Sequence, residues 1–226
     1  MGIILTLDKP LTAPLANTPV LRKMGEVIVS DSFGRTDPAT AAALYGSTTD
    51  NFKGGTPQQW TGTNGGSNNG TFARTVNDKL EFSPNAVTSL CLDAGQFNVD
   101  ASFKVESVGV GMGQGYNQMF DFRKASASSG DCYRLCFYTG SSESNFGMQL
   151  ARRVGTGATL SPVANLAAGS IVRVRAVGSN IKVYINDIIL WDIENTEITS
   201  GTFLGFSAAS TNRLSVFNDL IVRNVV

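Results

Sequence analysis

The chain has 226 residues, and its 18 acidic side chains balance its 18 basic ones. Because the charges balance, the sequence predicts no basic surface for nucleic acid or for an anionic membrane. No apolar run is long enough to span a bilayer, so membrane insertion is not predicted either. The 24 glycines and the charged fraction of 16 % favour a turn-rich β protein, while the absence of histidine excludes Ser-His-Asp and Cys-His catalysis and the usual zinc sites.

Residues 1–29 differ from the rest of the chain and are predicted to form an extended N-terminal arm. Pro10, Pro14 and Pro19 interrupt this segment, which forbids a helix and favours an extended path. The arm is also rich in aliphatic side chains, which have to be buried on something. It either folds back over its own domain or docks on a neighbouring subunit, and docking is the hypothesis adopted here. The residues assigned to docking are Ile4, Leu5, Leu7, Leu11, Leu15, Val20 and Leu21.

The globular domain is predicted to span residues 30–226 and to consist mainly of short strands. The alanines of 38–45 suggest a helical turn, and the polar, Gly-rich stretch 45–70 is interpreted as surface loops. Residues 97–106 alternate apolar and polar side chains without an error, which predicts a strand with one solvent-exposed face. Shorter strands are expected at 79–83, 87–92, 118–123, 133–138 and 146–150.

The last third of the chain is typical of a run of hairpins. Residues 171–177 and 181–186 alternate on either side of a turn at 178–180, whose Gly-Ser-Asn sequence tolerates the backbone angles of a tight hairpin. Residues 200–207 and 214–223 are expected to form the closing pair. Many short antiparallel strands separated by turns predict an all-β sandwich or jelly roll.

The three cysteines are Cys91, Cys132 and Cys136, and their odd number rules out a fully paired set of disulfides within the chain. Cys132 and Cys136 lie four residues apart in a strand-like stretch, which is too far for an easy disulfide. All three are therefore predicted to be small buried apolar side chains of a protein made in a reducing cytosol.

Two stretches of the sequence resemble the concanavalin-A-like lectin/glucanase jelly rolls, in the laminin-G-like style common in bacteriophage structural proteins. One is Ser-Asp-Ser-Phe-Gly-Arg-Thr-Asp at 30–37, with Trp60 downstream, and the other runs over 172–187, 200–206 and 217–224. The resemblance implies two curved antiparallel sheets with a concave face that often holds glycan. In phages it implies a place on tail fibres, tail tips or capsid surfaces and assembly as a homo-oligomer, for which a trimer is hypothesised.

No catalytic residue is predicted, although glycoside hydrolysis would need only two carboxylates at a fixed separation. The glucanases of this fold place acidic residues at alternate positions on one strand. Asp121 has no acidic partner two residues to either side, and Glu194 and Glu197 would point to opposite faces of a strand. The chain is therefore not predicted to be an enzyme.

No cofactor or metal is predicted either. The glycines of 109–115 lack the first, third and sixth spacing of a dinucleotide fingerprint, and no helix follows them. A calcium site would need clustered Asp and Asn ligands. The pairs Asn186-Asp187 and Asn218-Asp219 could contribute to one, but each is interpreted as a turn or a strand end.

Carbohydrate binding remains a possibility because sugars are held by aromatic rings together with amides and carboxylates. The candidate residues are Trp60, Tyr116, Asn117 and Tyr138. The competing interpretation is that Trp60 and Tyr138 only pack in the core or at its rim.

These observations lead to a bacteriophage virion structural protein as the first interpretation, a minor tail or tail-tip component assembled in the host cytoplasm. Its arm would dock on other virion proteins or sister subunits, and its sandwich would face outward, where it could contact host-surface glycan. One alternative is a capsid decoration protein that uses the same arm. A second alternative is a free carbohydrate-binding lectin, and a third is a glycanase with a degraded motif.

Overall fold

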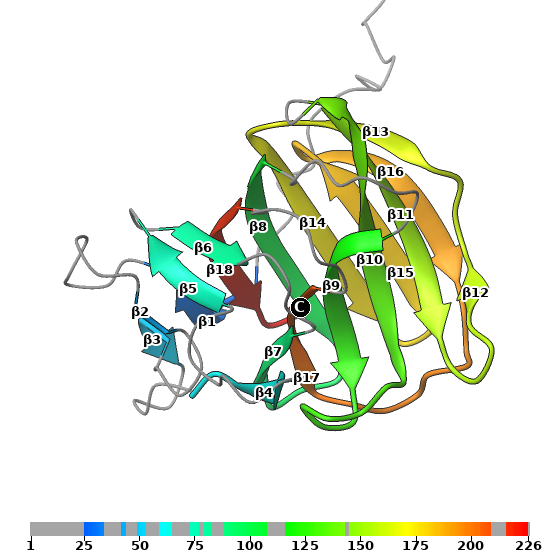
Figure 1. Cartoon of the computed structure of the whole chain (residues 1–226). Helices are drawn as coiled ribbons and strands as arrows, with labels where there is room; N and C mark the ends of the chain where they lie inside the picture. Colours follow the sequence, from blue (N-terminus) through cyan, green and yellow to red (C-terminus); the bar gives the residue numbers. More distant parts are fainter. Residues whose placement is uncertain are drawn as a thin grey trace, which may run out of the picture.

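The computed structural model describes residues 25–33, 42–43, 49–52, 59–64, 73–76, 79–82, 88–107, 116–142, 145–208 and 216–225. Within these residues all regular elements are β-strands, and they form two antiparallel sheets that pack face to face (Figure 1). The predicted all-β sandwich is confirmed. The part of the chain that is described holds no helix long and apolar enough to span a membrane. The predicted docking residues of the arm lie outside the described residues.

The larger sheet has ten strands. In spatial order it contains β16 (Ile188–Glu194), β15 (Asn180–Ile185), β14 (Ser170–Val177), β8 (Val99–Ser107), β18 (Val216–Arg223), β6 (Lys79–Phe82), β5 (Ala73–Val76) and β2 (Ala42–Ala43). Two further strands belong to this sheet. β1 (Val27–Asp31) pairs with β18, and β3 (Asn51–Phe52) pairs with β1. The predicted hairpin is confirmed as β14 and β15, which are joined at Gly178 and Ser179. Gly178 there has a φ of 54°, which glycine adopts without strain.

The smaller sheet has eight strands. In spatial order it contains β12 (Ala158–Thr159), β11 (Asn145–Arg153), β10 (Cys132–Ser142), β9 (Tyr116–Lys124), β17 (Phe203–Ala208), β7 (Thr88–Asp93) and β4 (Thr61–Asn64), and β13 (Ala164–Ala167) pairs with β11. The strands predicted at 87–92, 118–123, 133–138 and 146–150 belong to this sheet and are confirmed within a few residues.

Aromatic side chains from both sheets meet in the core. Phe103 of β8 contacts Phe120 of β9 and Phe206 of β17, with ring centroids 4.6 and 5.1 Å apart. Phe217 of β18 lies 4.8 Å from Phe206. These rings are fully or almost fully buried, and each such contact adds to the apolar area that holds the sheets together.

The two final strands do not form the predicted closing hairpin. β17 pairs with β7 and β9 in the smaller sheet, whereas β18 pairs with β8, β6 and β1 in the larger one. Both strands carry an apolar face, and they turn those faces toward one core from opposite sides. The predicted helical turn is wrong at Ala42–Ala43, which form strand β2, and the rest of 38–45 lies outside the described residues.

Candidate functional site

Strand β18 carries a bulge that shapes the outer surface of the ten-stranded sheet. Its register with β8 shifts between Asn218 and Ile221, so Asp219 and Leu220 together face a single residue of β8. Asp219 has a φ of 52°, in the left-handed region. As a result Leu220 is buried in the core, while Asp219 is exposed on the outer face.

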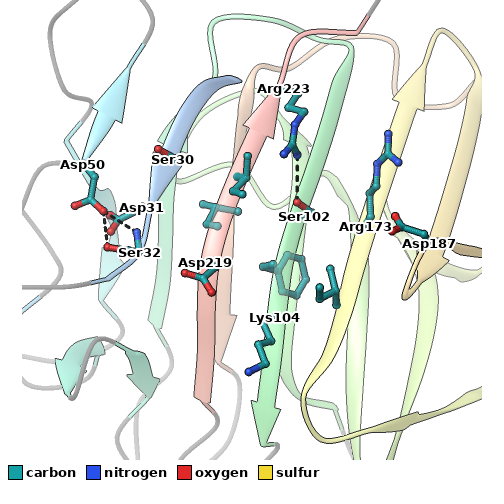
Figure 2. Close-up of a pocket in the computed structure, with 14 residues that line it drawn as sticks. Ser30, Asp31, Ser32, Asp50, Ser102, Lys104, Arg173, Asp187, Asp219 and Arg223 are labelled. Carbon is teal, nitrogen blue, oxygen red and sulfur yellow. Dashed lines mark hydrogen bonds between the residues drawn. The ribbon is translucent and has the colours of Figure 1, made fainter. Parts of the chain in front are cut away.

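A hollow of about 480 Å³ lies on this outer face, across β1, β18, β8 and β14 (Figure 2). The apolar residues of its lining are Ile171 and Ile221, together with Phe103 and Leu220, whose side chains are buried in the core. The polar ones are Ser30, Asp31, Ser32, Asp50, Ser102, Lys104, Arg173, Asp187, Asp219 and Arg223. The hollow therefore combines apolar surface with many hydrogen-bonding groups of both charges.

The acidic groups on the β1 side of the hollow are bound within the protein. The carboxylate of buried Asp31 accepts hydrogen bonds from the Phe33 amide and from Trp60 Nε1, both at 2.7 Å. Asp50 Oδ2 accepts from the Ser32 amide at 2.8 Å and from its hydroxyl at 2.6 Å. Asp31 and Asp50 thus fix the shape of this wall.

Arg173 on the β14 side is also held in place. Its guanidinium binds both carboxylate oxygens of Asp100 and lies 5.2 Å from the ring of Tyr184. The hydrogen bonds that Arg173 donates to Asp100 outweigh burial and raise the pKa of Arg173. Asp100 itself is buried, so the predicted solvent-exposed face of 97–106 is covered by an ion pair at this position.

Two carboxylates of the hollow have no hydrogen-bond partner among the described residues, those of Asp187 and Asp219. Asp187 belongs to the two-residue turn between β15 and β16, and it and Asn186 have φ angles of 64° and 49°. Asp187 and Asp219 are both exposed and lie on either side of β8 (Figure 2). Both carboxylates are therefore available to a ligand.

The cations of the hollow provide donors between these carboxylates. Lys104 donates to Glu106 at 2.8 Å, and this hydrogen bond raises the pKa of Lys104, with a smaller contribution from the charge of Asp219. Arg223 makes a long contact of 3.5 Å between Nη1 and the Ser102 hydroxyl. Both cations have more N–H donors than these contacts use, because an ammonium carries three donors and a guanidinium five.

The structure does not give Trp60 the exposed ring that sugar stacking needs. Its side chain is fully buried, its Nε1 is bound to Asp31, and its ring packs against Phe33 at 6.1 Å. The interpretation of 45–70 as surface loops is also wrong in part, because the described residues there include β3, β4 and this buried indole. Trp60 instead ties β1 to the start of β4.

The other predicted sugar-binding residues lie in the smaller sheet, at the start of β9 and in β10. Tyr116 of β9 is the register partner of Tyr138 of β10, while the side chains of Tyr116 and Asn117 lie outside the described part of the chain. Tyr138 is half-buried and donates a hydrogen bond from its hydroxyl to Gln149 Oε1. Strands β9, β17 and β7 separate Tyr138 from β4, so Trp60 does not belong to the same group.

Asp121 and the cysteines are buried in the smaller sheet. The carboxylate of Asp121 accepts from Arg134 Nε and Nη2 at 2.5 and 2.8 Å and from the Ser207 hydroxyl at 3.1 Å, so its oxygens are engaged in structural bonds. Cys91, Cys132 and Cys136 are free and buried, as predicted. Burial raises the pKa of all three thiols, that of Cys136 to about 12.

The described residues contain no group of three or more His, Cys, Asp or Glu side chains that could hold a metal ion. The hypothetical calcium ligands Asp187 and Asp219 both line the hollow, Asp187 from the β15–β16 turn and Asp219 from β18.

Sequence reasoning missed most of the hollow, including Lys104, Arg173 and Arg223. One available signal was the spacing of apolar residues in 214–223. Phe217 and Leu220 are three apart, whereas Leu220 and Val222 are two apart. A break of this kind in a period-2 pattern indicates a bulge, which often accompanies a binding site.

No protein-family model matches this chain, and no curated protein matches it. Several solved structures are similar. A variant of a GH43 protein from Bacillus licheniformis gives a TM-score of 0.52 at 10 % identity, over 85 % of this chain and 40 % of that one. Rv0315 of Mycobacterium tuberculosis, described as an immunostimulatory antigen and pseudo β-1,3-glucanase, gives 0.51 at 9 % identity, over 89 % of this chain and 100 % of that one.

A third structure, described under endo-acting O-glycanases of the human gut microbiota that initiate mucin breakdown, gives a TM-score of 0.50 at 10 % identity, over 89 % of this chain and 100 % of that one. Identities this low establish the fold alone. The fold is the concanavalin-A-like jelly roll that the sequence resembles. The bacteriophage part of the resemblance gains no support from these three structures.

Proposed function

We propose that this protein is a carbohydrate-binding module whose ligand lies in the hollow of the ten-stranded sheet. The observation that carries the proposal is the pair of open carboxylates, Asp187 and Asp219, on either side of a partly apolar surface. Carboxylates that accept from sugar hydroxyls, with cationic donors between them, are a usual means of orienting a glycan.

The apolar part of the hollow adds a surface for the C–H faces of a sugar. Ile171 of the hollow is half exposed, and Ile188 and Ile189 at the start of β16, outside the hollow's lining, are exposed as well. Apolar burial of this kind supplies affinity, whereas the carboxylates supply orientation. The solved neighbours whose names include glucanase and glycanase share this fold, which supports a glycan as the class of ligand.

The proposal predicts that Asp219→Ala and Asp187→Ala each weaken binding of the cognate glycan by about tenfold or more, since a hydrogen bond to a charged group contributes roughly 1.5–3 kcal/mol. A glycan array with the full chain would identify the sugar. Calorimetric titration of that sugar into each variant would then give the change in Kd.

Asp131→Ala is the matched control, because Asp131 is an exposed aspartate that lies just before β10 in the other sheet. Its affinity should equal that of the unmodified protein. An array without a single bound sugar would overturn the proposed function. A loss of affinity on Tyr138→Ala, with both hollow variants unaffected, would place the ligand on the smaller sheet and contradict this site.

A second candidate function is assembly into a virion through the N-terminal arm, supported by the aliphatic, proline-interrupted sequence of residues 1–24. Deletion of this segment should abolish incorporation into the particle or the homo-oligomer, measured by sedimentation, and leave glycan affinity unchanged. An unchanged sedimentation profile would contradict assembly through the arm. Because the deletion ends before Gly25, it preserves the contact in which the Asn224 amide donates to the Glu26 carbonyl at 2.8 Å.

A further inference from the structure

Arg123, at the end of β9, is a buried cation that has no ion-pair partner among the described residues. Its side chain is 1 % exposed, and neither Nη1 nor Nη2 has a hydrogen-bond partner among the described residues. Its remaining polar atom, Nε, makes a long contact of 3.4 Å with the carbonyl oxygen of Phe97. Up to four N–H donors of this guanidinium are thus left unused in the interior.

Two aromatic rings lie near this guanidinium. Its central carbon is 3.7 Å from the ring centroid of Phe97 and 5.9 Å from that of Tyr133. Arg123 has a φ of 57°, a left-handed conformation that is unusual for a side chain of this size. Since such a conformation persists only where the surroundings impose it, the cation is held at this position by the fold.

A second arginine lies across the same tyrosine. Arg152 of β11 is the register partner of Tyr133, and its Nε is also buried without a hydrogen-bond partner among the described residues. Its Nη1 forms an ion pair with Glu197, a half-exposed carboxylate. The Tyr133 hydroxyl is already engaged, because it donates to Asn195 Oδ1 at 2.6 Å and accepts from the Ile198 amide.

The charges around Tyr133 therefore do not balance. The positive charges of Arg123 and Arg152 both act on the Tyr133 hydroxyl. In the described part of the chain, the acidic group that pairs with one of them is Glu197, which binds Arg152. Burial lowers the pKa of Arg123 to about 10, so the group stays protonated at neutral pH. A buried charge without a partner is strongly unfavourable, and a native protein compensates it with a bound ion or ordered water.

We propose that Arg123 and Arg152 hold a small monovalent anion, of the class of chloride, beside Tyr133. An anion satisfies the charge as well as the unused donors, whereas water satisfies the donors alone. A monatomic anion fits a buried site beside two aromatic rings better than a phosphate or sulfate, which loses more hydration energy on burial. This site belongs to the protein interior and does not depend on the proposed glycan function.

The experiment is crystallography of the full chain grown or soaked in sodium bromide, combined with thermal unfolding in bromide and in fluoride at equal ionic strength. We expect an anomalous bromide peak within hydrogen-bond distance of Arg123 Nη1 or Nη2. We also expect the melting temperature to rise by about 3 °C in bromide over fluoride, since a ligand bound only to the folded state stabilises it.

Arg123→Met removes the charge but keeps much of the side-chain volume, and Arg153→Met is the control, because Arg153 is an exposed arginine on the same strand as Arg152. The bromide-dependent rise in melting temperature should vanish in the first variant and persist in the second. Ordered density at Arg123 without an anomalous signal would identify water and overturn the proposal. The crystal of the unmodified protein decides the question even if Arg123→Met fails to fold.

Discussion

Replacing Asp121 with Asn is expected to destabilise the fold by about 3–5 kcal/mol, the usual effect of breaking a buried ion pair from one side. Asp121 is fully buried, binds both Arg134 and the Ser207 hydroxyl, and lies 4.0 Å from the Lys124 ammonium. The amide preserves the shape of the carboxylate but not its charge. Two cations of the smaller sheet would then remain without their buried anion.

The pKa of Arg134 indicates how closely the pair is coupled. Burial alone would lower the pKa of this guanidinium, but the hydrogen bonds and charge of Asp121 outweigh burial and raise it above its ordinary value. Loss of the carboxylate removes the favourable contribution and leaves the desolvation of the cation in place. The expected loss of stability therefore comes mainly from Arg134, the buried cation that remains.

Urea denaturation would measure the effect, and Asp192→Asn provides the control. Asp192 is paired with Lys182 at 2.7 Å on the outer face of the larger sheet, with 47 % of its side chain exposed. Its substitution should leave the urea midpoint nearly unchanged, because solvent screens such pairs. In the double variant Asp121→Asn with Arg134→Met, part of the lost stability should return. Equal losses in the single and double variants would show that the ion pair is not the cause.

The strands that could be predicted are those whose pattern is complete within a short window. Alternate side chains from Val99 to Val105 in β8 and from Val172 to Ala176 in β14 are apolar and buried, so alternation alone located both strands. The β14–β15 hairpin could be predicted for the same reason, because its two strands and the turn between them are consecutive in the sequence. Strand β16 was missed because it begins with the run Ile188-Ile-Leu-Trp191, in which exposed and buried positions both carry apolar side chains.

Strand partners could not be predicted, because they depend on residues far away in the sequence. β18 pairs with β8 and β1, more than a hundred residues earlier, and none of these pairings leaves a mark in β18 itself. The expected closing hairpin failed for this reason. The hollow depends on the same pairings, since its walls are brought together only when β1, β18, β8 and β14 become neighbours.

Trp60 illustrates a different difficulty. The residues around it are polar and rich in glycine, which is typical of an exposed loop. Its burial depends on Asp31, whose carboxylate satisfies the indole nitrogen inside the protein. A buried polar atom needs such a partner, and the partner here lies in β1, so the local sequence could not reveal it.

Gly205 is the position at which the smallest change is expected to have one of the largest effects. It lies in the middle of β17, between Cys91 of β7 and Asp121 of β9. A Cβ atom added there would lie 2.0 Å from the Leu90 carbonyl oxygen and 2.7 Å from the Cys91 Cα. Both atoms belong to the backbone of a paired strand, so neither can move aside as a flexible side chain could.

Gly205→Ala is therefore expected to destabilise the protein by about 3 kcal/mol or more, at the upper end of the effects of overpacking, or to prevent folding. Soluble yield and the urea midpoint would measure this. Gly130→Ala is the control, because a Cβ there meets no atom within 4 Å and Gly130 is not among the glycines with positive φ. That variant should match the unmodified protein or gain slightly, since alanine restricts the unfolded chain. If Gly205→Ala unfolded at the same urea concentration as Gly130→Ala, the close approach of β7 and β17, and with it the register that buries Asp121, would be wrong.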